Sequence, residues 1–289
     1  MNLDVIIVNY NSGALLRKCL DSIFAGNDRI ALRIMTIDNA SHDQSLKDAI
    51  ASYPGLTIIR NRRNLGFARA VNQGIRNTGS DFILLVNPDA EIASGGIKAM
   101  LDFMSTHTDC GVLGGLVYYP NGKRQETARR FPTLATVVLG RRTSMLYRLF
   151  PGNPFSRRYL LLDADFSRAR QVDFVAGTFM MLRREALNEV GLFDEDYFLY
   201  VEDADLCYRM KRHGWKVWFT PDARCTHLYG ENIREDNIRP AVYHAQSMYR
   251  FLAKHLRPPP VLTLFIRTAV HLKNVETIAW GFFKRSFVR

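Results

Sequence analysis

The stretch Asp81-Phe-Ile-Leu-Leu-Val-Asn-Pro-Asp-Ala-Glu91 decides how this chain folds. Its five consecutive apolar residues, Phe82 to Val86, are typical of a strand buried on both faces of a mostly parallel sheet. Pro88 has no N–H with which to continue a ladder, so the strand must end there. Taken alone, Asn87-Pro88-Asp89 fits an ordinary turn as well as a site. However, ligands of open α/β sheets bind beyond the carboxyl ends of strands, where the Asp89 carboxylate could hold a divalent ion against a phosphate.

The residues around this stretch repeat one plan of apolar strand, polar loop and helix. Strands are predicted at 3–8, 32–37, 56–60, 111–119, 172–182 and 215–219. Helices are predicted at 14–24, 46–51, 95–104, 184–190 and 237–255, with two more ending near Gly79 and Gly214. This alternation indicates a parallel, doubly wound nucleotide-binding half. The chain has neither the P-loop motif Gly-x-x-x-x-Gly-Lys-Ser/Thr nor the dinucleotide-binding motif Gly-x-Gly-x-x-Gly. A phosphate would therefore have to be bound by a metal ion and by side chains.

Composition is that of an ordinary globular protein, with 289 residues, 47% hydrophobic and 23% charged. The four cysteines are widely spaced, which favours reduced thiols in the cytosol and argues against a structural zinc site. The N-terminus does not have the pattern of a signal peptide, and no stretch approaches the ~20 apolar residues of a membrane-spanning helix. We therefore expect a cytoplasmic protein, with peripheral association at the inner face of the cytoplasmic membrane left open.

Most of the formal net charge of +11 is concentrated in residues 120–170. This segment has ten arginines and one lysine against three acidic residues, which gives +11 − 3 = +8. We expect loops and short amphipathic helices here, lying over the main fold. Such a patch attracts a nucleic acid, an anionic lipid surface or a pyrophosphate substrate, although it is equally consistent with a solvated basic surface. No nucleic-acid-binding motif is present, so we expect no nucleic-acid partner.

A second polar cluster, residues 193–205, precedes and enters a predicted helix. Asp205 and Arg209 are four residues apart and are predicted to pair on the surface of that helix. Glu202 and Asp203 lie at its positive end, where helix capping is the simplest explanation for both. His227, alone after the last predicted strand, is either a hydrogen-bonded surface group or a metal ligand.

The last segment, residues 258–289, begins with three prolines and is apolar and basic. Its apolar positions form two helical stripes that do not share a face, which predicts two short helices bent near Asn274. This C-terminal helical extension could pack on the body, pair with another subunit to form a homo-oligomer, or lie in a lipid interface. Residues 1–257 are predicted to form the main domain.

Six motifs, in order along the chain, resemble those of family 2 inverting glycosyltransferases with the GT-A fold, and bacterial rhamnosyltransferases of cell-wall and O-antigen assembly most closely. The resemblance covers residues 3–255 and leaves the tail outside. The motifs are Val8-Asn-Tyr-Asn-Ser12, Ile37-Asp-Asn-Ala-Ser41, Asn64-Leu-Gly-Phe-Ala with Asn72-Gln-Gly74, Asn87-Pro-Asp89, Glu202-Asp-Ala-Asp205 and His227-Leu-Tyr-Gly230.

The resemblance implies a GT-A domain, a Rossmann-like, mostly parallel sheet flanked by helices, and a role for each motif. The base, ribose, diphosphate and sugar of the donor would meet these residues: Asn9, Tyr10, Asn11, Asp38, Asn64, Gly66, Phe67, Asn72 and Asn87. The family's two-carboxylate metal motif is reduced here to Asn87-Pro88-Asp89, so Asp89 would hold Mg²⁺ or Mn²⁺ with help from His227 and the diphosphate. Asp203 would be the catalytic base, with Glu202 in support.

The activity that the resemblance implies is transfer of L-rhamnose from dTDP-rhamnose to a glycan or a polyprenyl-diphosphate-linked acceptor. Chemistry agrees with this assignment, since a cation can stabilise the departing diphosphate while a carboxylate on the opposite face takes the acceptor proton. Three alternatives remain: a transferase for another donor such as UDP-galactofuranose or a UDP-hexose, a sugar nucleotidyltransferase of related fold, and a non-catalytic nucleotide- or glycan-binding relative. The nucleotidyltransferase is disfavoured because the first loop has Asn9-Tyr-Asn-Ser12 where a glycine-rich basic loop would be expected.

Overall fold

The computed structural model describes residues 2–25, 30–136, 149–150, 152–228, 238–256, 263–264 and 268. The strands of its central sheet are β1 Asn2–Asn9, β2 Ala31–Asp38, β3 Thr57–Arg60, β4 Phe82–Val86, β5 Ala90–Ile92, β6 Cys110–Tyr118, β8 Arg170–Gln171, β10 Phe179–Arg183 and β11 Lys216–His227. The order across the sheet is β3-β2-β1-β4-β10-β6-β11-β5, with β8 also paired to β11. A small separate sheet pairs β7 Ala128–Arg129 with β9 Phe174–Val175.

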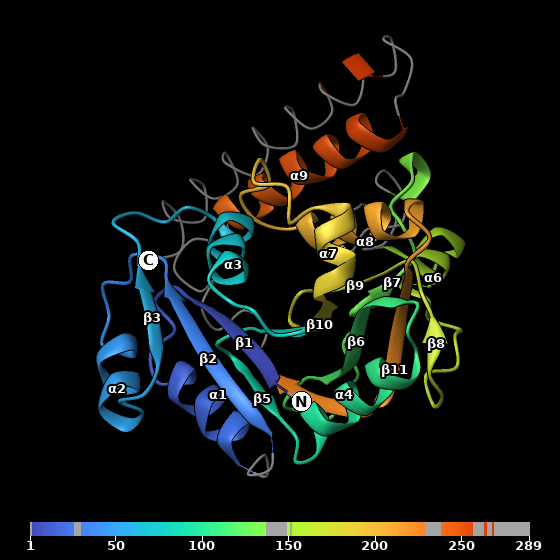
Figure 1. The fold of residues 1–289 in the computed structure, drawn as a ribbon. Helices are drawn as coiled ribbons and strands as arrows, with labels where there is room; N and C mark the ends of the chain where they lie inside the picture. The colour runs from blue at the N-terminus through green and yellow to red at the C-terminus, as the bar shows by residue number, and fades with distance from the viewer. Residues whose placement is uncertain are drawn as a thin grey trace.

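Helices cover both faces of the central sheet, so the fold has three layers (Figure 1). The helices are α1 Leu15–Phe24, α2 Ser45–Ser52, α3 Phe67–Arg76, α4 Gly96–Thr106, α6 Pro154–Leu160, α7 Arg184–Val190, α8 Glu202–Arg212 and α9 Ile238–Leu256. One apolar core lies between the sheet and α1, α2 and α4; the other lies between the sheet and α3, α7, α8 and α9. This is the α/β architecture expected from the sequence, with a mostly parallel half at its start.

Strand β1 shows how the sequence produces the layers. Its alternate residues Leu3, Val5 and Ile7 enter the core under α1 and α4, whereas Ile6 enters the core under α3. All four are at most 1% exposed, and each such burial stabilises the fold by about 1.5–3 kcal/mol. Because β1 is apolar on both faces, it can occupy the middle of the sheet, parallel to both β2 and β4.

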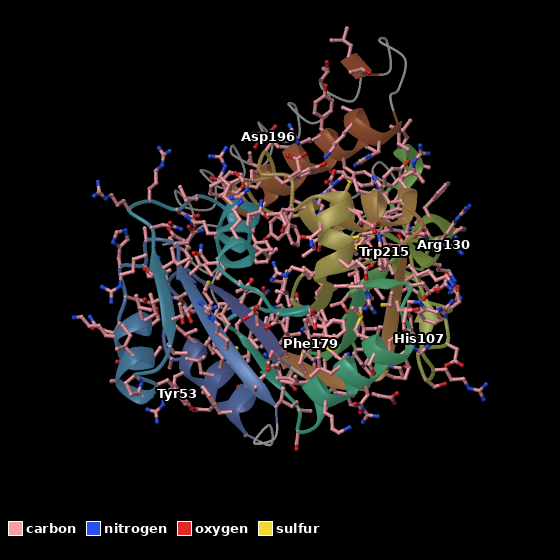
Figure 2. All side chains as sticks on the ribbon, in the orientation of Figure 1. Tyr53, His107, Arg130, Phe179, Asp196 and Trp215 are labelled. Carbon is pink, nitrogen blue, oxygen red and sulfur yellow. The ribbon has the colours of Figure 1, made fainter. Side chains whose placement is uncertain are left out.

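The predicted strand at 172–182 is wrong as a single element. The chain leaves the small sheet after Val175, turns through Ala176-Gly177-Thr178, and enters the central sheet as β10. There β10 runs antiparallel to both β4 and β6. Phe179, the first residue of β10, is buried in the middle of the molecule, whereas Arg130 and Asp196 lie on its outside (Figure 2).

Other predicted elements are confirmed with adjusted ends. The predicted strand at 215–219 is longer, and as β11 it continues to His227. The basic segment was predicted to contain only loops and short helices. Its described part contains the helix α6, but also the short strand β7 and the start of β8. Residues 137–148 of that segment, and nearly all of the extension at 258–289, lie outside the described residues. Within the described residues, no helix is both long enough and apolar enough to span a bilayer.

Candidate active site

A cavity of about 480 Å³ opens at the carboxyl ends of the parallel strands β1 and β4. It is bordered by Val8 and Tyr10 at the end of β1 and by the turn after β4. Asp89, Asp203 and His227, which are far apart in the sequence, all line it. The other predicted site residues that line the cavity are Asn64, Gly66, Phe67, Asn87 and Glu202.

The pairing of β5 with β11 brings Asp89 and His227 together. Ala90, the residue after Asp89, is the register partner of His227, and the Leu228 N–H donates to the Asp89 carbonyl at 3.0 Å. The His227 Nε2 atom therefore lies 3.1 Å from Asp89 Oδ1, and both side chains are largely buried. The Asn87 amide nitrogen is 3.4 Å from the same ring nitrogen. The predicted pair thus meets through sheet register, which no local pattern encodes.

The Asp89–His227 pair fits part of a divalent-ion site. Carboxylate oxygens and imidazole nitrogens both serve as ligands of divalent transition-metal ions such as Mn²⁺. Their separation matches the ~3 Å expected between adjacent ligands of an octahedral ion with bonds of about 2.1 Å. No group of three histidine, cysteine, aspartate or glutamate side chains suited to a metal occurs among the described residues. These two side chains would therefore leave most coordination positions to the substrate and to water.

The second carboxylate of the site, Asp203, lies in the first turn of α8. The helix begins after two residues in left-handed conformation, Tyr200 and Val201. Asp203 accepts hydrogen bonds from the Gly177 N–H at 3.2 Å and the Ala204 N–H at 2.7 Å. Burial raises the pKa of Asp203 above its ordinary value of 3.8, against the opposing effects of these N–H groups and Arg129. A raised pKa makes this carboxylate a stronger base.

Glu202, next to it, is 5% exposed, and its Oε2 atom has no hydrogen-bond partner among the described residues. Burial first, and then the charge of Asp203, raise the pKa of Glu202 well above its ordinary value. Two adjacent carboxyl groups in one cavity wall therefore have different surroundings. Asp203 is held by two backbone donors, whereas Glu202 is buried with an unsatisfied oxygen.

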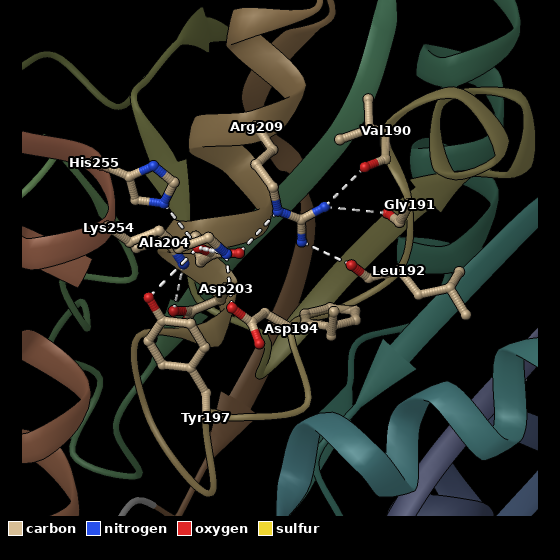
Figure 3. A network of polar contacts seen from close by, with 12 residues as sticks. Val190, Gly191, Leu192, Asp194, Tyr197, Asp203, Ala204, Arg209, Lys254 and His255 are labelled. Atoms are coloured by element: carbon tan, nitrogen blue, oxygen red, sulfur yellow. Dashed lines mark hydrogen bonds and ion pairs between the residues drawn. The ribbon is translucent and has the colours of Figure 1, made fainter. Parts of the chain in front are cut away.

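Asp205 anchors this helix and is not among the residues that line the cavity. Its carboxylate accepts from Arg209 at 2.8 Å and contacts Lys254 and His255 of α9, each at 2.7 Å; Figure 3 labels these three partners. Arg209 also donates to the carbonyls of Val190 and Leu192. The predicted Asp205–Arg209 pair is confirmed, but its predicted surface position is wrong, because Asp205 is 0% exposed. The network fixes the start of α8, and with it Asp203, to α9 and to the loop after α7.

Three of the residues predicted to meet the donor brace the first two loops and are not among those that line the cavity. The Asn9 amide donates to Asp38 at 2.9 Å and to Ser45 at 3.0 Å, and it is fully buried. Asn11 accepts from the His42 N–H at 2.8 Å. The donor contacts of Asn9, Asn11 and Asp38 stay predictions, whereas their bracing contacts between the loops after β1 and β2 are observed.

Asn72 also lies away from the cavity. Its amide donates to the Phe193 carbonyl at 2.9 Å and to Glu195 at 3.0 Å, and its oxygen accepts from the Phe193 N–H at 3.1 Å. Both the amide nitrogen and the amide oxygen are thus used to hold the loop before α8 against α3. The predicted contact of Asn72 with the donor stays a prediction, and the visible role is to position that loop.

The loop before α3 is held by an asparagine, Asn39, that was not among the predicted site residues. Asn39 donates to Asn64 at 2.9 Å and to the Gly66 carbonyl at 3.2 Å, and accepts from the Leu65 N–H at 3.1 Å. Gly66 has a φ of +85°, and a Cβ there would lie 2.5 Å from the Phe198 carbonyl oxygen. The glycine is therefore required by both conformation and space, and it lets the loop close on the segment before α8.

Several other residues that line the cavity were also not predicted: Gln125, Arg129, Tyr159, Gly177, Tyr200 and His244. Gln125, Arg129 and Tyr159 come from the basic segment, for which the sequence predicted a role only through its charge. Gly177 belongs to the turn hidden inside the predicted strand at 172–182. The six motifs did not assign a role in the site to any of these residues.

Known proteins resemble this chain both in sequence and in fold. The model of the family described as "Glycosyltransferase like family 2" matches residues 2–242. The N-acetylglucosaminyl-diphospho-decaprenol L-rhamnosyltransferase of Mycobacterium tuberculosis is 31% identical over 87% of this chain and 84% of its own. Rhamnosyltransferase WbbL of Escherichia coli is 24% identical over 86% and 92%. The mannosyltransferase PcManGT from Pyrobaculum calidifontis, solved with GDP-Man and Mn²⁺, superposes with a TM-score of 0.59 at 18% identity, over 96% of this chain and 72% of its own.

Proposed function

We propose, from the premise that this chain belongs to glycosyltransferase family 2 and has the GT-A fold, that it transfers L-rhamnose from dTDP-rhamnose to a lipid-linked glycan in cell-surface polysaccharide synthesis. The names of the M. tuberculosis and E. coli relatives support the sugar, and the diphospho-decaprenol in the first name supports the acceptor class. The observation that carries the proposal is the convergence of Asp89, His227 and Asp203 on one cavity.

The donor side of the site is formed by Asp89, His227 and Asn87. We assign Asp89 and His227 to a divalent cation, Mg²⁺ or Mn²⁺, and the presence of Mn²⁺ in the archaeal mannosyltransferase structure supports this. When bound, such an ion supplies stabilisation of the negative charge on the departing diphosphate. Gly66 and Phe67 border the same cavity, and the backbone there can approach a nucleotide closely because residue 66 has no side chain.

The acceptor side is assigned to Asp203. In the proposed inverting reaction, the acceptor hydroxyl oxygen bonds to the anomeric carbon as the bond from that carbon to the phosphate oxygen breaks. The hydroxyl proton passes to Asp203, which must be ionised to receive it, and the diphosphate leaves with the electron pair of the broken bond. Attack from the face opposite the leaving group inverts the anomeric configuration. The backbone N–H groups of Gly177 and Ala204 hold the carboxylate for this role.

The part of the cavity wall formed by α6 favours the proposal that the acceptor is carried in a membrane. Tyr159 and Leu160 line the cavity, whereas Phe155 of the same helix and Leu162 beyond it are exposed at 39% and 36%. Phe150, just before the helix, is 64% exposed. Apolar side chains on a strongly basic segment suit the surface of an anionic bilayer. We place this edge against the cytoplasmic face of the membrane, where it would receive a polyprenyl-diphosphate acceptor.

Transfer assays test the central proposal. We expect dTDP-rhamnose, among dTDP- and UDP-sugars, to be consumed fastest in the presence of a lipid-linked N-acetylglucosamine diphosphate, and only with Mg²⁺ or Mn²⁺. NMR of the product should show inversion at the anomeric carbon. Faster turnover of a UDP-hexose would refute the donor assignment, and full activity in excess EDTA would refute the metal assignment.

A flotation assay tests the membrane edge separately. Binding to vesicles containing phosphatidylglycerol should exceed binding to pure phosphatidylcholine vesicles and should weaken with salt. Replacing Phe150 and Phe155 by serine should reduce flotation. Equal flotation on both vesicle types at every salt concentration would contradict the assignment, and the cavity chemistry would be unaffected.

A further inference from the structure

We propose that Gln125 is a positioning residue that fixes the tautomer of His227, so that the Nε2 lone pair is presented beside Asp89 for a divalent cation. The inference rests on the proposed function, because it deepens the metal assignment made there. The evidence for it is a separate set of contacts, which Gln125 makes on the Nδ1 side of the imidazole ring. Gln125 belongs to none of the motifs found in the sequence.

The backbone around Gln125 places its side chain before any ligand is considered. The Gln125 N–H donates to the Val117 carbonyl at 2.8 Å, and the Gln125 carbonyl accepts from the Thr127 N–H at 2.9 Å. The side chain is buried, with the residue only 5% exposed. Gln125 is therefore tied to β6, the neighbour of the strand that carries His227.

Two backbone carbonyls then determine which way the Gln125 amide points. Its Nε2 atom donates to the His227 carbonyl at 2.7 Å and lies 3.3 Å from the Tyr118 carbonyl. In the reversed orientation the amide oxygen would face both carbonyl oxygens, and three acceptors would be buried against one another without a donor. The amide oxygen must therefore face the imidazole, and it lies 2.9 Å from His227 Nδ1.

An amide oxygen only accepts, so His227 Nδ1 must carry the proton of that hydrogen bond. In a neutral imidazole the lone pair is then on Nε2, which lies 3.1 Å from Asp89 Oδ1. The lone pair and the carboxylate oxygen are then adjacent electron-pair donors that one cation can accept from, while the Asn87 amide nitrogen lies 3.4 Å from the same ring nitrogen. The arrangement is that of a metal ligand oriented by a buried hydrogen-bonding partner.

Mn²⁺ binding, measured by electron paramagnetic resonance on the enzyme saturated with dTDP, tests this inference without turnover. We expect Gln125→Leu to weaken Mn²⁺ binding about 10–100-fold, as is typical when the partner of a metal-bound histidine is lost. His227→Ala should weaken it at least as much. Adding Gln125→Leu to His227→Ala should cause no further loss, because Gln125 acts through the ring. The matched control is Gln171→Leu, which makes the same change at an exposed position of β8 that does not line the cavity and should leave Mn²⁺ binding unchanged.

The outcomes separate this inference from the function on which it rests. Normal Mn²⁺ binding by Gln125→Leu, with a large loss in Asp89→Asn and His227→Ala, would overturn the role of Gln125 and leave the metal site intact. An equal loss from Gln125→Leu in the presence and absence of His227 would also overturn it, since the effect would be general damage. Normal binding by Asp89→Asn and His227→Ala would overturn both.

A measurement on the unmodified protein covers the case in which Gln125→Leu does not fold. Long-range ¹H–¹⁵N NMR distinguishes the two neutral tautomers, and the His227 signals can be identified by their loss in His227→Gln. We expect the proton on Nδ1. A proton on Nε2 in the neutral ring would overturn the inference.

Discussion

Replacing Asp203 by asparagine removes the proposed base while it changes the local shape very little. The asparagine oxygen can keep the shorter hydrogen bond, from the Ala204 N–H at 2.7 Å. The amide nitrogen then faces the Gly177 N–H, which donates to the aspartate at 3.2 Å, so one hydrogen bond is lost. That loss costs about 1–3 kcal/mol of folding free energy, and it is partly offset because a buried carboxylate no longer has to be ionised.

The effect on the reaction should be much larger than the effect on folding. Loss of a general base lowers kcat by about 10²–10⁴-fold, which corresponds to about 2.7–5.5 kcal/mol of barrier. Because burial raises the pKa of Asp203 above 3.8, and only the ionised form accepts a proton, wild-type kcat/KM should fall as the pH drops through that raised pKa. This acidic limb should be absent in Asp203→Asn.

Initial rates of rhamnosyl transfer, measured from pH 5 upward with donor affinity followed by thermal shift, would check both statements. The matched control is Glu202→Gln, which makes the same chemical change one residue earlier in the same cavity wall. If Asp203→Asn kept more than a tenth of kcat with normal donor binding, Asp203 would not be the base. If Glu202→Gln alone abolished turnover, the base would be Glu202.

Three further predictions concern stability. Burial raises the pKa of Glu202, so above pH ~4.5 the folded state binds more protons than the unfolded state. The stability of the wild type therefore falls as the pH rises. We expect Glu202→Gln to raise Tm, and to raise it more at pH 8 than at pH 5. Asp205→Asn should cost about 3–5 kcal/mol in urea unfolding at pH 7, because it removes the charge of a fully buried carboxylate that contacts Arg209, Lys254 and His255. Because these partners lower the pKa of Asp205, that difference should shrink below pH ~3.8, and a pH-independent difference would contradict it. Gly66→Ala should lower the free energy of unfolding by about 1–3 kcal/mol or more and weaken donor binding, because its Cβ would lie 2.5 Å from the Phe198 carbonyl oxygen. The control is Gly79→Ala, whose Cβ would have no described atom within 4 Å. It should change the free energy of unfolding by no more than about 0.5 kcal/mol.

The first half of the fold could be predicted because its signals are local. Each strand from β1 to β4 is an apolar run that ends at a polar loop, and parallel strands bring those ends to one edge. Pro88 marks one such end without reference to any other part of the chain. Asp89 could therefore be placed at this edge of the sheet from a single stretch of sequence, although that stretch alone fits an ordinary turn as well as a site.

Residues that act through distant contacts could not be found in this way. Asn39, although within the motif at residues 37–41, and Gln125 were not predicted as site residues, and each is important because loops from elsewhere supply its partners. The prediction for Asp205 failed in a related way. Its four-residue spacing to Arg209 correctly predicted the pair, but only the packing of α9 shows that the pair is buried with Lys254 and His255.

The turn hidden in the predicted strand at 172–182 connects the two sides of the site. Its Thr178 carbonyl accepts from the Asn87 N–H at 3.0 Å, which supports the turn that carries Asp89. One residue earlier, the Gly177 N–H donates to Asp203. The turn exists because the chain must reverse direction to insert β10 antiparallel between β4 and β6, a pairing that apolar periodicity cannot reveal. The antiparallel insertion that made the strand prediction wrong therefore connects the turn that carries Asp89, the proposed cation ligand, to Asp203, the proposed base, through adjacent residues of one turn.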